Sequence, residues 1–169
     1  YTPQRTGTVP IEVRAEGHRD TGILLVVDKD DKVILIEIES ALKESPLSDR
    51  PRRDSRHIVT DLAQECKVVY LNNLLGAILF EGWLKKEKFP ESAVLRWQGA
   101  NTLKRLTGRG IKLHAIIGSA NTISQAKKHI QNRYTFEATK DGRRVDDWEE
   151  IMEFLREESN QAGRPSDKE

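Results

Sequence analysis

The chain has 169 residues, a length that suits one domain with a sizeable hydrophobic core. Its 28 Lys and Arg residues and 27 Asp and Glu residues leave a formal net charge of +1, so no overall field favours nucleic acid or a membrane surface as the partner. No apolar run approaches the roughly 20 residues that span a bilayer, no signal peptide is recognised, and the single cysteine, Cys66, cannot form an internal disulfide. These features predict a cytoplasmic protein without a transmembrane segment.

Short apolar strand patterns and amphipathic helix patterns alternate along most of the chain. Strands are predicted at residues 8–14, 23–27, 33–38, 68–71, 93–97, 113–117 and 134–137. Helices are predicted at residues 57–63, 75–83, 103–106, 123–130 and 146–156. A basic loop without periodicity occupies residues 45–55.

The alternation of strand and helix from residue 23 onward predicts an α/β fold. We expect a three-layer, Rossmann-like parallel sheet covered by helices on both faces. Residues 1–20 are predicted to be a strand or linker that ends a preceding module, residues 21–158 to be the domain, and residues 159–169 to be a disordered tail.

Three aspartates, Asp28, Asp30 and Asp31, follow the apolar run at residues 23–27. Because this run is short and entirely apolar, it predicts a central parallel strand, whose carboxyl end is where open α/β sheets place their chemistry. Carboxylates at that point favour a magnesium ion. Residues 23–38 are also predicted to form a β-hairpin flap across the aspartates. The alternative is an acidic β-turn between two strands.

Two later strands also end in polar residues. The strand at residues 68–71 ends at Asn72 and Asn73, and the strand at residues 113–117 ends at Gly118 and Ser119. In a parallel sheet these residues and the aspartates would meet at one edge. The sequence therefore predicts a site assembled from several strand ends.

The order and spacing of these landmarks resemble the haloacid dehalogenase (HAD) superfamily, and most of all the lipin-type domain shared by lipins and phosphatidylinositol-transfer proteins. The resemblance covers residues 23–151. The segments that carry it are Val26-Val27-Asp28-Lys29-Asp30-Asp31, Val69-Tyr70-Leu71-Asn72-Asn73, Trp83-Leu84, Phe89-Pro90, Lys104 and Ile116-Ile117-Gly118-Ser119.

The resemblance implies an aspartyl-phosphate mechanism. Asp28 would attack phosphorus, and Asp30 would move the proton for the leaving group and the attacking water. Asn72 and Lys104 would bind the phosphoryl oxygens and neutralise their charge. The implied magnesium ligands are Asp28, Asp30, Ser119 and Asn121.

The sequence departs from this family pattern in its fourth motif. The family has one or two acidic residues after the position of Gly118, whereas this chain has none between Ser119 and Ser124. Neutral oxygens hold a hard divalent cation weakly, and Lys32 adds a positive charge four residues after Asp28. We therefore expect a degenerate domain that binds a phosphorylated ligand or partner with weak or no hydrolysis.

The spacing of the motifs leaves no room for a large cap domain over the site. An open cleft suits a phosphate displayed on a lipid or a macromolecule. Arg50, Arg52 and Arg53 of the basic loop, together with Arg56 just after it, could add phosphate contacts, although such loops are more often simply solvated.

Three other functions remain open at this point. The first is an active, magnesium-dependent phosphohydrolase that uses Asp28 and Asp30. The second is a PD-(D/E)XK-like nuclease, in which Asp28 and the following Glu37-x-Glu39 strand would form the core hairpin, with Glu39 where that fold has lysine. The third is an interaction module that uses the acidic helix at residues 146–156.

Overall fold

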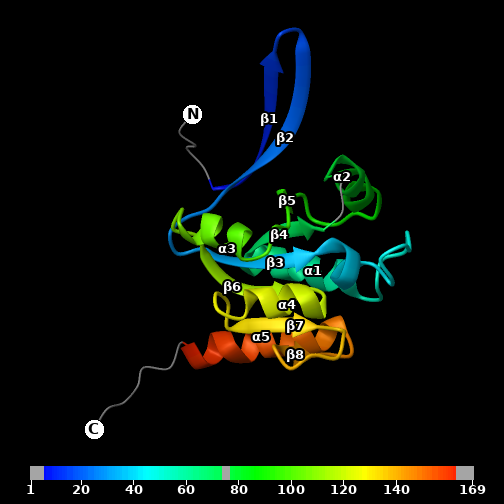
Figure 1. The fold of residues 1–169 in the computed structure, drawn as a ribbon, viewed down its shortest axis with the longest axis vertical. Helices are drawn as coiled ribbons and strands as arrows, with labels where there is room; N and C mark the ends of the chain where they lie inside the picture. Colours follow the sequence, from blue (N-terminus) through cyan, green and yellow to red (C-terminus); the bar gives the residue numbers. More distant parts are fainter. Residues whose placement is uncertain (1–5, 74–76, 163–169) are drawn as a thin grey trace.

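A parallel β-sheet forms the centre of the molecule (Figure 1). The computed structural model describes residues 6–73 and 77–162. Within these residues the sheet has six strands in the order β5-β4-β3-β6-β7-β8, and every neighbouring pair is parallel. Its strands are β3 (Lys32–Glu37), β4 (Lys67–Asn72), β5 (Val94–Arg96), β6 (Lys112–Ile117), β7 (Asn132–Thr135) and β8 (Arg143–Arg144).

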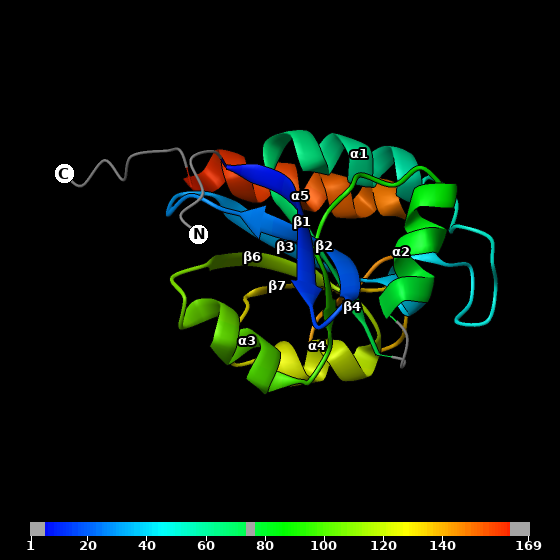
Figure 2. The ribbon, with the colours of Figure 1, turned by 90° about the horizontal axis from the view of Figure 1, so that it is seen from above.

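Helices cover both faces of this sheet. They are the π-helical turn η1 (Ile38–Leu42) and the α-helices α1 (Ser55–Glu65), α2 (Ala77–Lys86), α3 (Ala100–Thr107), α4 (Ala120–Ala126) and α5 (Trp148–Ala162). Figure 2 shows α1 and α5 on one face and α3 and α4 on the other. The predicted α/β class with a parallel sheet is thus confirmed, and the strand order is compatible with a Rossmann-like fold.

The central strand β3 carries the apolar run Val33-Ile34-Leu35-Ile36, which is almost fully buried. A central parallel strand is covered on both faces, so it needs apolar residues at every position rather than at alternate ones. Ile34 and Ile36 pack toward α1 and α5, whereas Val33 and Leu35 pack toward α3 and α4. The sequence therefore specifies β3 as the strand shared by both hydrophobic cores.

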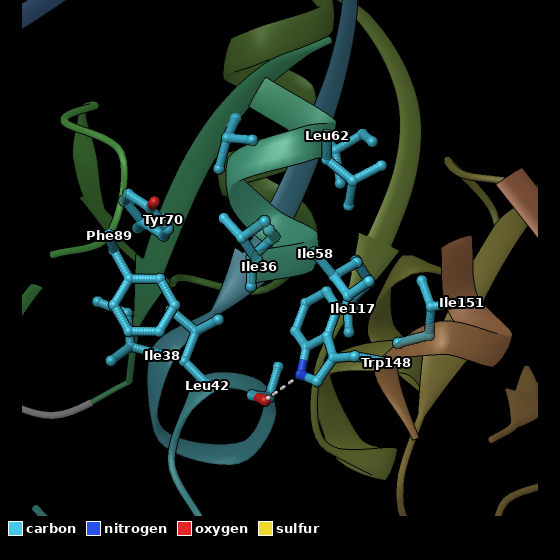
Figure 3. Packing of buried hydrophobic residues seen from close by; sticks show 14 of the residues in the cluster. Ile36, Ile38, Leu42, Ile58, Leu62, Tyr70, Phe89, Ile117, Trp148 and Ile151 are labelled. Carbon is cyan, nitrogen blue, oxygen red and sulfur yellow. Dashed lines mark hydrogen bonds between the residues drawn. The ribbon is translucent and has the colours of Figure 1, made fainter. Parts of the chain in front are cut away.

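The core beneath α1 and α5 is closed by Trp148, which has no exposed surface (Figure 3). Its indole Nε1 donates a hydrogen bond of 3.1 Å to the backbone oxygen of Ala41. This bond joins the start of α5 to η1, 107 residues earlier in the chain. The C-terminal helix thus anchors the segment that follows β3.

An antiparallel hairpin of β1 (Gly7–Ala15) and β2 (His18–Val26) precedes the sheet and projects away from it in Figure 1. The prediction that residues 23–27 form a central parallel strand is therefore wrong, and so is the predicted flap at residues 23–38. In the described residues β2 pairs only with β1, and β3 pairs only with β4 and β6. Strand β2 pairs instead with β1, and Leu25 of β2 and Val27, just after it, pack against the core beneath α3 and α4.

Several boundaries differ from those expected. The predicted domain boundary at residue 20 falls inside β2, and α5 extends to Ala162 rather than ending before residue 159. Helix α4 ends at Ala126, and the short strand β8 was not predicted. Leu75, at the start of a predicted helix, and residues 163–169 lie outside the described residues.

The strand order places a topological switch point between β3 and β6. From β3 the chain winds outward through β4 and β5, then returns to β6 and winds the other way. The connections at such a point diverge, so ligands of open α/β sheets bind there, beyond the carboxyl ends of the strands. We call this side of the sheet the carboxyl edge and the opposite side the amino edge.

None of the described helices has the length and apolar composition that crossing a bilayer requires.

Candidate functional site

Glu37, the last residue of β3, lies at the switch point. Its side chain is 2% exposed. One carboxylate oxygen accepts hydrogen bonds from the backbone N–H of Ser119 at 2.8 Å and from its hydroxyl at 3.1 Å, and the other accepts from Asn73 Nδ2 at 2.5 Å. Glu37 therefore ties together the segments that follow β4 and β6.

Gly118 makes room for this carboxylate. A Cβ atom at position 118 would lie 2.6 Å from Glu37 Oε2 and 3.1 Å from a methyl carbon of Thr122. Real Cβ contacts are essentially never shorter than 3.0 Å, and both neighbours are buried. The glycine is needed here for close approach.

A second buried carboxylate, that of Glu39, follows two residues later on η1 and is 4% exposed. Its Oε1 accepts a hydrogen bond of 2.9 Å from the backbone N–H of Asn73. The π-helical turn takes Glu39 out of the strand alternation and brings it to the end of β4. Such single-turn π segments occur frequently at functional sites.

Asn72 ends β4 and is 1% exposed. Neither its Oδ1 nor its Nδ2 has a hydrogen-bond partner among the described residues. A buried amide without partners costs free energy, of order 1–3 kcal/mol for each unsatisfied group. The structure thus confirms that Asn72 lies at a strand end on the carboxyl edge.

Lys43 directly follows η1 and is only 8% exposed. Its Nζ lies 5.6 Å from the ring centre of Phe80 and 5.4 Å from that of Trp83, both on α2. No carboxylate of the described residues lies within ion-pair distance of it. A lysine is rarely buried without a charged partner.

The three aspartates lie at the amino edge, away from these residues. Asp30 binds Lys112 at 2.7 Å and Asp31 lies 4.0 Å from Lys67, and these lysines are the first residues of β6 and β4. The hydrogen bond and the charge of Lys112 lower the pKa of Asp30. The backbone N–H of Asp31 donates to the oxygen of Asp28 at 3.1 Å, which closes a β-turn. The alternative interpretation of Asp28–Asp31 as an acidic turn is therefore correct.

The side chains of Lys104 and Asn121 do not join the buried polar residues at the carboxyl edge either. Lys104 lies in the last turn of α3, which runs toward the start of β6, and its side chain is exposed. Asn121 is exposed on α4, where its Oδ1 accepts a 3.3 Å hydrogen bond from Gln125. Of the predicted site residues, Asn72, Ser119 and Asn121 lie at the carboxyl edge, and the side chain of Asn121 is exposed there.

The predicted magnesium ligands do not fit a metal ion. Asp28 and Asp30 lie at the opposite edge of the sheet from Ser119 and Asn121, so the four cannot converge. The Ser119 hydroxyl is used by Glu37 and Thr122. In residues 6–73 and 77–162 no three His, Cys, Asp or Glu side chains are grouped so that they could hold a metal.

The basic loop borders a surface pocket of about 410 Å³ in which carboxylates outnumber arginines. Arg53 pairs with Asp54 at 3.1 Å. Arg52 donates to the backbone oxygen of Ser40 and stacks on Phe136, with its guanidinium carbon 4.1 Å from the ring centre. The arginines thus support the loop, and the pocket does not offer an anion a cationic lining.

From the sequence, Glu37 and Glu39 were expected at a site only in the nuclease alternative, and Lys43 was not expected at one. The two glutamates could be predicted from the sequence as strand-end carboxylates, because they directly follow the buried apolar run of β3. The first strand of the parallel sheet is β3 rather than the apolar run at residues 23–27, so the strand-end carboxylates are Glu37 and Glu39. Nothing in the sequence around Lys43 indicates that its ammonium will meet two aromatic rings.

Comparison with known proteins adds no assignment, since neither a known family nor a curated protein matches this chain.

Proposed function

We propose that this chain is a degenerate HAD-like domain that binds a phosphorylated ligand at its carboxyl edge without hydrolysing it. The resemblance implies two carboxylates, separated in the sequence by one residue, at the end of the first parallel strand. Glu37 and Glu39 have this spacing and this place. The proposal moves the site from Asp28 and Asp30 to these glutamates and keeps Asn72 as a ligand-binding residue.

The observation that carries the proposal is the environment of Glu37. A nucleophilic carboxylate needs one oxygen directed at phosphorus, but both oxygens of Glu37 are engaged by Asn73 and Ser119, and its side chain is 2% exposed. Glu37 serves as a structural link where the family has its nucleophile.

The described residues contain no grouped set of metal-ligating side chains, and this supports the same conclusion. Phosphoryl transfer depends on cations that neutralise charge in the transition state. In the part of the chain that the structure describes, the carboxyl edge has two buried glutamates, and no three His, Cys, Asp or Glu side chains are grouped so that they could hold a metal. Binding needs less than catalysis, and the amide of Asn72, which has no hydrogen-bond partner within residues 6–73 and 77–162, is suited to it.

The test combines calorimetric titration with inorganic phosphate and turnover of p-nitrophenyl phosphate in the presence of Mg²⁺. We expect the whole chain to bind phosphate and to show no turnover above the blank. Asp28→Asn is the matched control and should bind phosphate like the unaltered chain, because Asp28 lies at the amino edge. Turnover that disappears in Glu37→Gln would establish an active phosphohydrolase instead. Absence of phosphate binding would overturn the proposal.

A further inference from the structure

A second surface pocket lies at the amino edge, where β7 and β8 meet the C-terminal helix α5. Figure 1 shows these three elements next to one another. The pocket has a volume of about 540 Å³, which is within the range of small-molecule sites. Its lining comes from residues 131–134 at the start of β7, from the loop at residues 140–143 that leads into β8, and from Glu158 of α5. It is therefore separate from the site at the carboxyl edge.

Contacts outside the pocket hold its loop wall in place. The carboxylate of Asp141 accepts hydrogen bonds from Lys127 at 2.6 Å and from the hydroxyl of Ser124 at 2.9 Å, so its charge is already paired. Arg133 Nε donates a hydrogen bond of 2.6 Å to the backbone oxygen of Asp141. A Cβ at position 142 would lie 2.9 Å from the backbone oxygen of Arg133, so the loop packs closely on β7. A wall that is fixed in advance lowers the cost of binding a ligand.

The guanidinium of Arg143 is held by an aromatic ring. Its central carbon lies 3.9 Å from the ring centre of Phe154. The five N–H groups of a guanidinium lie in its own plane, so stacking on a ring face positions the group and leaves these donors for other partners. Among residues 6–73 and 77–162, no carboxylate lies within ion-pair distance of Arg143. A fork of this kind matches the two oxygens of a ligand carboxylate.

Glu158 supplies the opposite charge in the same pocket. Its Oε1 accepts a hydrogen bond of 2.9 Å from the hydroxyl of Tyr134, whereas its Oε2 is buried and has no partner in the described segments. Burial, and then the hydrogen bond to Glu158, raise the pKa of Tyr134, and the charge of Arg143 acts in the opposite direction. Both charged groups therefore lie near this hydroxyl, but they form no ion pair with each other.

We propose that this pocket binds a free α-amino acid, with the ligand carboxylate on Arg143 and the ligand ammonium group on Glu158. An ammonium group would supply the donor that Glu158 Oε2 lacks. Arg133 and Lys140 also line the pocket, and no carboxylate of the described residues forms an ion pair with either, so their charges favour the carboxylate end of the ligand. The buried oxygen of Glu158 disfavours a ligand that carries only negative charge.

The first experiment is an NMR titration of the isotope-labelled whole chain with each of the protein amino acids in turn. At least one of them should shift the backbone amides of residues 131–134 and 140–143. Its N-acetyl derivative, which lacks the ammonium charge, and its methyl ester, which lacks the carboxylate, should each bind at least about tenfold more weakly, the effect of losing a charge-assisted hydrogen bond. Because both derivatives are tested on the unaltered chain, this result does not depend on the folding of a variant.

The same titration is then made with substituted chains. Arg143→Gln should weaken binding about tenfold or more, and so should Glu158→Gln, which keeps an acceptor for Tyr134 but removes the charge. Arg144→Gln is the matched control, because Arg144 pairs with Asp146 at 3.2 Å and does not line the pocket. Its affinity should equal that of the unaltered chain.

Three results would overturn the inference. They are the absence of shifts at the pocket with any amino acid, an affinity that Arg143→Gln leaves unchanged, and an N-acetyl derivative that binds as tightly as its parent, which would indicate a simple anion site. The proposed function stands in each case, since it concerns phosphate binding at other strand ends.

Discussion

The carboxylate of Glu37 fills the space beside Gly118 that any larger side chain would need. A Cβ at position 118 would lie 2.6 Å from Glu37 Oε2, and Glu37 cannot withdraw without giving up its bonds to Ser119 and Asn73. Glu37 ends β3, and Gly118 directly follows the adjacent strand β6. Their fit fixes the distance between the two halves of the sheet at the switch point.

Gly118→Ala should therefore lower the free energy of unfolding by about 1–3 kcal/mol, the usual cost of overpacking a buried site. Urea unfolding followed by circular dichroism measures it. Gly82→Ala is the control, because position 82 is exposed on α2 and its added Cβ would meet nothing within 4 Å. Since alanine favours helix by about 1 kcal/mol over glycine, this control should gain stability. Equal effects of the two substitutions would contradict the role of Gly118.

Trp148→Phe should destabilise the chain by about 1–3 kcal/mol, because it removes the hydrogen bond to Ala41 and leaves a small cavity. Trp97→Phe is the matched control. Trp97 is also buried, at 8% exposed, but its indole N–H has no partner among the described residues. Its loss therefore removes an unsatisfied donor and should cost clearly less in the same urea experiment. A larger cost for Trp97→Phe would contradict the anchoring role of Trp148.

His114 should make stability depend on pH. Burial, and secondarily the charge of Lys32, lower the pKa of His114 below its ordinary value of about 6.5, while Glu158 acts in the opposite direction. Between the folded-state pKa and 6.5, the unfolded chain binds more protons than the folded one. The contribution of neutral His114 is thus complete above pH 6.5 and is lost as the pH falls through the folded-state pKa.

The measurement for His114 is the unfolding free energy between pH 5 and 7.5. His114→Gln should flatten the slope, while His18→Gln, at an exposed position of the hairpin, should preserve it. An unchanged slope in His114→Gln would show that another group is responsible.

Cys66 should react slowly with thiol reagents in the folded state. Burial raises the pKa of its thiol; the charge of Lys32 opposes this shift, and the charges of Glu65 and Asp31 add smaller contributions in the same direction as burial. Since the thiolate is the reactive form, less of it is present at pH 8 than in an exposed cysteine. Reaction with 5,5′-dithiobis(2-nitrobenzoate) should be slower than that of glutathione and should accelerate in urea. Native reaction as fast as glutathione would contradict this placement.

The parallel sheet was predictable from the sequence because its strands are apolar at nearly every position and alternate with helix patterns. Residues 33–37, 68–71 and 113–117 all became strands of this sheet. Periodicity reports burial but not the pairing partner. The run at residues 23–27 therefore resembled a central strand, although it pairs with β1 in a hairpin.

Because residues 23–27 were expected in the parallel sheet, the site was also expected at the wrong residues. Asp28 and Asp30 follow a hairpin strand and precede β3, so they lie at the amino edge. Asn72 was placed correctly because it ends a strand that does belong to the sheet. The environment of Lys43 could not be predicted for a different reason. It depends on how α2 packs against η1, which short-range sequence patterns do not encode.

The strand order also constrains how the chain reaches its folded state during synthesis. β3 pairs with β4 early, but its other neighbour, β6, starts 80 residues after it, with Lys32 opposite Lys112. Contacts between such distant residues form late, because a long loop must close first. Glu37 leaves the ribosome long before Gly118 and Ser119 have been added. Until then one flank of the most apolar strand has no neighbour, and this interval is when the nascent chain is most exposed to aggregation.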